Sequence, residues 1–150
     1  MREYIIVAMP VVLIILLMIG SVTDLKSHTV PLWLSAVGFG IKGIELAVLE
    51  PNNIKSHLLF AFLLFGVLFT NVILGGLGGA DSMLGAMCGI YLGIFGVYAV
   101  MVAFLFSLPH AAYAKKRKDG ESREYPFIPY LLLGVCVVYM FFLSKKRIYF

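Results

Sequence analysis

The stretch Gly75-Gly76-Leu77-Gly78-Gly79-Ala80-Asp81-Ser82-Met83-Leu84 lies between two strongly apolar runs and decides how the chain folds. It places one carboxylate, Asp81, directly behind a run of glycines. An ionised side chain inside a membrane helix costs about a few kcal/mol, so an acid in this setting is rare unless it has a function. Glycine lets two backbones approach closely and adopts dihedral angles that other residues avoid. The stretch therefore predicts a buried acid beside a backbone segment that an extended substrate strand can approach.

The composition predicts an integral membrane protein. The chain has 150 residues, of which 61% are hydrophobic and 13% are charged, and its mean hydropathy is +0.99. Soluble domains carry about a quarter charged residues. The apolar residues form long blocks, which predicts an all-α polytopic membrane helix bundle of about six spans. We expect a single membrane-embedded domain over residues 1–150, with the chemistry in or beside the bilayer because no separate soluble catalytic domain is predicted.

The apolar runs on either side of the glycine stretch set the expected helices. These are predicted over residues 4–22, 31–49, 54–74, 82–92, 95–114 and 126–143. Gly85, Gly89 and Gly93 recur every fourth residue, so they share a helix face and permit close helix packing. Gly93 to Gly96 predicts a tight reversal, and Pro109 predicts a kink near the end of the fifth helix.

A second acid, Asp24, lies at the end of the first apolar run, within a predicted polar turn over residues 23–31. Pro31 suits the first turn of the helix that follows, where its missing N–H costs nothing. We expect Asp24 and Asp81 to form one site. The structural alternative is that each acid caps a helix at the membrane interface, Asp81 as the N-cap of a helix beginning at Ser82.

Two close carboxylates cannot both ionise comfortably, because repulsion and desolvation favour sharing one proton. The ionised acid draws a proton from water while the protonated acid donates to a carbonyl oxygen or leaving nitrogen, which hydrolyses an amide by general acid–base catalysis. This chemistry requires no metal, no cofactor and no covalent intermediate. His28 and His57 lie near opposite ends of the second predicted span, and His110 has no obvious partner, so no histidine set competes with the acids. The two cysteines, Cys88 and Cys136, lack metal-ligand spacing and are expected to pack in the core.

The charged residues bear on topology. In a six-span arrangement Lys26, the cluster 115–118 and Arg123 fall on the same side as both acids, which the positive-inside tendency makes cytoplasmic, although Lys145-Lys146-Arg147 opposes this. The basic clusters are expected to contact lipid headgroups, and nucleic-acid binding has little support. Lys42 and Glu45 are three residues apart on one helix face, which predicts a snorkelling lysine paired with a glutamate near the outer rim.

Three motifs in order resemble those of the type IV prepilin peptidases, membrane aspartyl proteases of the GxGD type. They are Asp24-Leu25-Lys26 with Pro31, then Gly78-Gly79-Ala80-Asp81, then Pro126-Phe127-Ile128-Pro129. The resemblance implies that Asp24 and Asp81 are the catalytic pair, facing the cytoplasm from a multi-pass protein of the cell membrane. The motif residues expected to bind substrate are then Gly78, Gly79, Ala80, Pro31, Pro126 and Pro129. It also implies a prepilin-like substrate (a type IV or Flp pilin, or a pseudopilin) that is cut between a basic leader and a hydrophobic helix.

The sequence departs from the family pattern in several places. The third motif glycine is Ala80, the lysine usual two residues after the second aspartate is Met83, and the asparagine often found after Pro31 is Leu32. The paired Cys-x-x-Cys motifs of the larger members are missing, so we predict no N-methyltransferase activity. Three alternatives stay open at this point: a non-catalytic membrane subunit, a small ion-coupled transporter that uses the same carboxylates, and an inactive relative of the peptidases.

Overall fold

The computed structural model confirms an all-α fold over the residues that it describes. Backbone is described for residues 2–27, 30–73, 78–116 and 126–148, and side chains for 8–27, 30–73, 78–110, 112–113 and 126–142. The elements are α1 (Arg2–Ser27), α2 (Leu32–Leu49), the 3-10 helix η1 (Pro51–Asn53), α3 (Ile54–Ile73), α4 (Gly79–Leu92), α5 (Ile94–Lys116) and α6 (Ile128–Ile148). The loop predicted over residues 115–125 is helical at its first two positions, where α5 continues to Lys116, and the rest of it lies outside the described residues, as do Gly75, Gly76 and Leu77.

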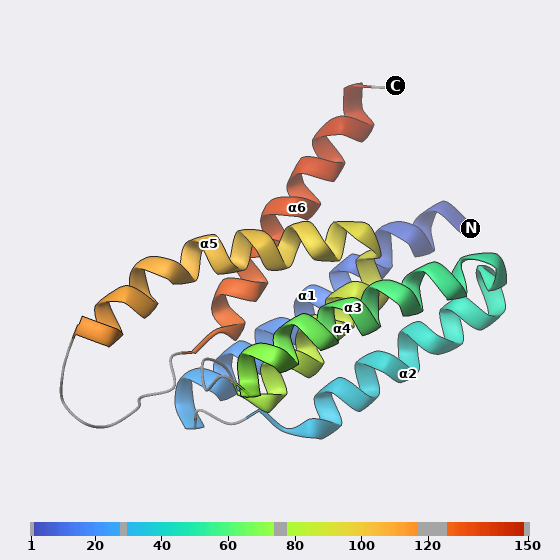
Figure 1. Cartoon of the computed structure of the whole chain (residues 1–150). Helices are drawn as coiled ribbons and strands as arrows, with labels where there is room; N and C mark the ends of the chain where they lie inside the picture. Colours follow the sequence, from blue (N-terminus) through green and yellow to red (C-terminus); the bar gives the residue numbers. More distant parts are fainter. Residues whose placement is uncertain (1, 28–29, 74–77, 117–125, 149–150) are drawn as a thin grey trace.

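Successive helices run in alternating directions through the bundle. Figure 1 shows that α1, α3 and α5 finish at the same end of the bundle, where α2, α4 and α6 begin. This end carries Asp24 and Asp81, and we call it the aspartate end. At the opposite end, η1 links α2 to α3, and a turn at Gly93 links α4 to α5.

The helices have the length and composition of membrane spans. Among the described residues, Ala8–Ser27, Leu32–Leu49 and Pro51–Ile73 are long and apolar enough to cross a bilayer, and Ile94–His110 and Ile128–Phe142 are shorter apolar stretches. Large apolar side chains also point outward, among them Ile44 at 69%, Val48 at 71% and Phe62 at 72% exposure. Such an exterior suits lipid rather than water. The protein is therefore a membrane helix bundle.

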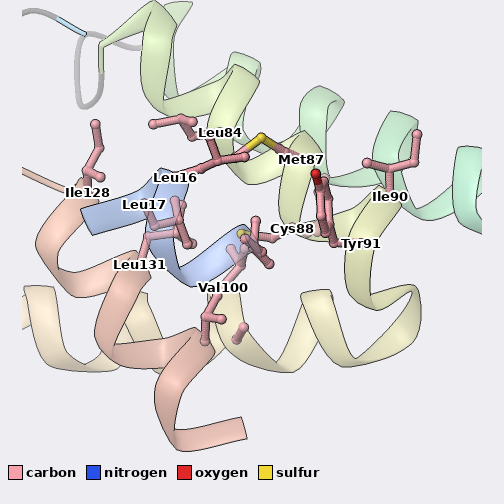
Figure 2. Packing of buried hydrophobic residues seen from close by; sticks show 14 of the residues in the cluster. Leu16, Leu17, Leu84, Met87, Cys88, Ile90, Tyr91, Val100, Ile128 and Leu131 are labelled. Carbon is pink, nitrogen blue, oxygen red and sulfur yellow. The ribbon is translucent and has the colours of Figure 1, made fainter. Parts of the chain in front are cut away.

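The short helix α4 lies at the centre of this bundle. Ten of its 14 residues are buried, and it packs against α1, α2, α3, α5 and α6. Figure 2 shows Leu84, Met87, Cys88 and Tyr91 of this helix among apolar side chains of its neighbours. Close approach depends on glycine: a Cβ at Gly89 would lie 2.7 Å from the Phe60 carbonyl oxygen of α3. The predicted glycine packing face is confirmed.

Two helix boundaries differ from the prediction. The helix α1 continues through Asp24 to Ser27, so the predicted polar turn at 23–31 is wrong over its first five residues. Local hydrogen bonds make this possible, because Thr23 Oγ1 donates to the Gly20 carbonyl at 2.8 Å and Ser27 Oγ donates to the Thr23 carbonyl at 2.9 Å. The helix α4 begins at Gly79, three residues before the predicted start.

The turn between α4 and α5 agrees with the prediction of a tight reversal. Gly93 ends α4 with a φ of 57°, in a region that favours glycine, and its N–H donates to the Gly89 carbonyl at 2.8 Å. Only one residue separates the two helices. This reversal returns the chain as α5, which packs against α4 and α6.

The Lys42–Glu45 pair forms as predicted, but its location differs. Lys42 Nζ contacts Glu45 Oε2, and the two residues are only 5% and 7% exposed. The predicted snorkelling position at the outer rim is therefore wrong. Because α2 turns its apolar residues Ile44 and Val48 outward, its charged residues face the interior of the bundle.

We expect Gly89→Ala to destabilise the protein by about 1–3 kcal/mol, because the added methyl meets the backbone of α3 and the two helices must separate. The matched control is Gly66→Ala on α3, where a Cβ would meet no described atom within 4 Å. The free energy of unfolding, measured in detergent micelles, checks this. Equal stability of the two variants would contradict the close α3–α4 packing.

Candidate active site

Both predicted catalytic acids are buried at the aspartate end. Asp24 lies in the last turn of α1 and is 8% exposed, and Asp81 lies in the first turn of α4 and is 7% exposed. The helices α1 and α4 pack against each other and run in opposite directions (Figure 1). Acids are almost never buried to this extent in an apolar bundle without a specific role.

A layer of side chains around Gly20 shows how these helices meet. A Cβ at Gly20 would lie 3.2 Å from Leu34 Cδ2 of α2, 3.5 Å from Leu84 Cδ1 of α4 and 3.7 Å from Ile128 Cγ2 of α6. We call these four residues the Gly20 layer. Four helices therefore converge on a position that only a residue without a side chain leaves open.

The Gly20 layer puts the two acids on the same side of it. Asp24 follows Gly20 by about one helical turn along α1, and Asp81 precedes Leu84 by about one turn along α4. Because the two helices are antiparallel, both steps lead toward the aspartate end. Pro31 is the N-cap residue of α2, which runs parallel to α4, and it precedes Leu34 by three residues. It therefore also lies on the side of the Gly20 layer that faces the aspartate end.

The start of α4 holds the Asp81 carboxyl in place. The Gly78 N–H donates to Asp81 Oδ2 at 3.0 Å, and the Asp81 N–H donates to the Gly78 carbonyl at 3.1 Å. Ser82 Oγ donates to the Gly79 carbonyl at 2.7 Å. Gly78 is therefore the N-cap residue, and the predicted N-cap role of Asp81 is wrong, although its side chain does bond the end of the helix from the third position.

The third motif fixes the start of α6. Phe127 and Ile128 are fully buried, and the Phe127 ring lies 5.1 Å from that of Phe104 in α5. Pro126 and Pro129 on either side are half-buried. The buried pair thus anchors α6 to α5 and, through Ile128, to the Gly20 layer, while the predicted substrate-binding role of the two prolines stays a prediction.

Two of the three departures from the family pattern lie on exposed positions. Met83 is 37% exposed and Leu32 is 67% exposed, whereas Ala80 is half-buried. Residues two apart on a helix point in different directions, so position 83 does not face the same way as Asp81. A lysine at position 83 would therefore extend from another face of α4, and its replacement by methionine leaves the buried surroundings of Asp81 intact.

Sequence reasoning missed several residues that build this site. Gly20 gave a usable signal, since it precedes Asp24 by one turn. His110 also has a partner: its Nδ1 lies 2.6 Å from the Tyr130 hydroxyl, which joins the end of α5 to the start of α6. His110 and Tyr130 are twenty positions apart, on either side of a charged segment, and no sequence pattern predicts that they meet. Cys88 and Cys136 are free thiols, buried and half-buried, in agreement with their predicted packing role.

The chain was compared with known proteins. The model of the type IV leader peptidase family matches residues 11–115, a range that includes most of α1, all of α2 to α4, nearly all of α5 and both aspartates. No curated protein and no solved structure gives a match. The family match covers more than half of the chain and includes the first two of the three motifs, whereas Pro126-Phe127-Ile128-Pro129 lies beyond it. This membrane helix bundle belongs to the type IV leader peptidase family.

Proposed function

We propose that the protein is a membrane aspartyl endopeptidase that removes the basic leader of prepilin-like precursors, with Asp24 and Asp81 as its catalytic pair. One observation carries this proposal: two buried acids lie on contacting antiparallel helices, on the same side of the Gly20 layer. The family match supports leader-peptidase chemistry. The whole bundle acts as one catalytic domain in this proposal, because the four helices of the Gly20 layer pack together about one helical turn from the acids.

The two acids divide the work of amide hydrolysis. One carboxylate takes a proton from water, and the resulting hydroxide attacks the scissile carbonyl carbon while the other carboxyl donates its proton toward the carbonyl oxygen. Burial keeps one proton on the pair, because two adjacent carboxylates in an apolar setting do not both ionise. The proton taken from water then passes to the leaving nitrogen as the C–N bond breaks, and a hydroxyl of the tetrahedral intermediate returns its proton to the other carboxylate as the new carboxyl group forms. The Gly78 N–H holds Asp81 Oδ2 in a fixed orientation for these steps.

The start of α4 is suited to an extended peptide. Gly78 is half-buried and Gly79 is exposed, and a Cβ at Gly79 would meet no described atom within 4 Å. A peptide strand can therefore approach this backbone without displacing side chains. A prepilin-like precursor fits in a second respect, because its hydrophobic helix can lie in the lipid against the apolar exterior of the bundle while its leader reaches the aspartates.

The aspartate end faces the cytoplasm in this proposal. Lys26 is exposed in the last turn of α1, beside Asp24, and the basic cluster at 115–118 begins at the end of α5. Cationic residues concentrate on the cytoplasmic side of membrane proteins. A leader with basic residues is also found on that side before cleavage, so site and substrate meet at the inner face of the cell membrane.

We expect Asp24→Asn and Asp81→Asn each to abolish cleavage of a tagged prepilin-like precursor, because each removes one member of the acid–base pair. The loss in rate should be about 10²- to 10⁴-fold or larger. The matched control is Glu50→Gln at the opposite end of the bundle, where Glu50 Oε2 accepts a hydrogen bond from Asn53 at 3.0 Å. Co-expression followed by a gel mobility assay measures the fraction of precursor cleaved.

Two results of this assay would contradict the proposal. Cleavage that persists in both aspartate variants would show that another protein or another site does the work. An absence of cleavage by the unaltered protein, across pilins and pseudopilins, would favour the transporter or subunit alternatives, in which the same carboxylates carry protons or cations.

A second prediction separates the structural contribution of Asp81 from the catalytic one. Asp81→Ala removes the acceptor of the Gly78 N–H and should lower the free energy of unfolding by about 1 kcal/mol. Asp81→Asn retains an amide oxygen that accepts the same hydrogen bond and should cost less stability, yet both variants should lose cleavage. Unfolding in detergent checks the first effect. Full cleavage activity in the folded Asp81→Asn variant would reduce Asp81 to a helix-capping residue.

A further inference from the structure

A buried polar cluster lies toward the opposite end of the bundle from the aspartates. Lys42 and Glu45 of α2 form an ion pair, and Lys42 Nζ lies 5.8 Å from the centre of the Tyr91 ring of α4. The Tyr91 hydroxyl donates to the Gly38 carbonyl of α2 at 2.9 Å. These three side chains, which we call the α2–α4 anchor, are each at most 7% exposed.

The α2–α4 anchor is placed where it can fix one helix along the other. Both helices start at the aspartate end, and their contacts follow one register: Leu34 and Leu84 share the Gly20 layer, a Cβ at Gly38 would overlap the Met87 sulfur, and Lys42 lies over Tyr91. Asp81 and Tyr91 are ten residues apart on α4, about 15 Å along the axis. A short rigid helix therefore has an acid at one end and the anchor near the other.

Apolar packing alone fixes such a register weakly. Contacts between aliphatic side chains are not directional, whereas the hydrogen bond from Tyr91 to the Gly38 carbonyl and the position of Lys42 over the Tyr91 ring join the two helices and are lost when α4 slides along α2. Glu45 is on the same helix as Lys42 and acts by holding the lysine at this position. Contacts of α4 with other helices do not fix its position along α2. His57 of α3, for example, bonds the Ile90 carbonyl at 2.7 Å, which ties α4 to α3 but gives no contact to α2.

We propose that Lys42, Glu45 and Tyr91 are positioning residues that fix the height of α4 along α2, and thereby hold Asp81 level with Asp24. The catalytic consequence rests on the proposed function, whereas the geometric consequence does not. A group displaced by about 1 Å from its reactive position costs about 10²-fold in rate. The α2–α4 anchor therefore supports catalysis without touching the substrate.

The decisive variant is the double change Lys42→Met with Glu45→Leu. Replacing both members of a buried ion pair by apolar residues is often neutral for stability, whereas removing one member leaves an uncompensated charge. We expect the double variant to fold like the parent but to lose roughly 10- to 100-fold in kcat with KM unchanged. Tyr91→Phe, which retains the ring beneath Lys42 and loses only the bond to Gly38, should show the same pattern more weakly. Its matched control is Tyr98→Phe, at a tyrosine that is 52% exposed on α5.

A crosslinking measurement tests the geometry without any cleavage. Cysteines replace Asp24 and Asp81 in a background that carries Cys88→Ala and Cys136→Ala, and the rate of disulfide formation in membranes is followed after an oxidant is added. We expect the double variant and Tyr91→Phe to change this rate several-fold, and Tyr98→Phe to leave it unchanged.

These readouts separate the two proposals. A double variant that cleaves with the parent's kcat and crosslinks at the parent's rate would overturn the positioning role, because apolar packing would then suffice. If the unaltered protein cleaves no precursor, the proposed function fails, and the crosslinking rates alone decide the positioning role.

Discussion

The close contact of α4 with its neighbours is the constraint on which the rest of this structure depends. A helix of 14 residues can lie at the centre of a six-helix bundle only if the surrounding helices approach to backbone distance. Gly85 and Gly89 permit that approach, since a side chain at either position would meet Leu68 or the backbone of α3. In lipid, where burial of apolar surface gives little driving force between helices, such packing supplies much of the association energy. The same closeness keeps most residues of α4, Asp81 included, away from the exterior.

The helices themselves were largely predictable from the sequence. The long apolar runs are interrupted by Pro31, Glu50-Pro51 and the glycine stretch. In lipid a backbone must pair its own N–H and C=O groups, so each run is expected to form a helix between these interruptions. The ends were less predictable. Thr23 and Ser27 read as turn residues by type, yet their hydroxyls bond to carbonyls one turn back, and α1 continues past Asp24. Residue type alone does not show whether a hydroxyl bonds within a helix or ends it.

The candidate site was predictable in its members and less so in its construction. Asp24 and Asp81 stood out because acids beside apolar runs are costly, and that reasoning required no contact information. The Gly20 layer depends on the register of four helices, which no local pattern encodes. The inward orientation of Lys42 and Glu45 was missed for a similar reason: α2 is apolar on most of its surface, so its periodicity does not reveal which face meets the bundle. Lys42 lies over the ring of Tyr91, which is 46 residues from Glu45 in sequence, so no local pattern connects them.

The two polar clusters on α4 obey the same physics with opposite outcomes. At the α2–α4 anchor, the buried Lys42 and Glu45 have opposite charges and lie beside the Tyr91 ring. Each charge is compensated by the other, so neither group is driven to take up or release a proton. At the aspartate end, the buried groups are two acids of the same sign, and in the proposed function neither compensates the other. In that proposal a shared proton relieves the repulsion and leaves the pair able to accept a proton from water and to give one away. One helix can thus have an inert end and a reactive end because what burial does to a charged group depends on the sign of its neighbour.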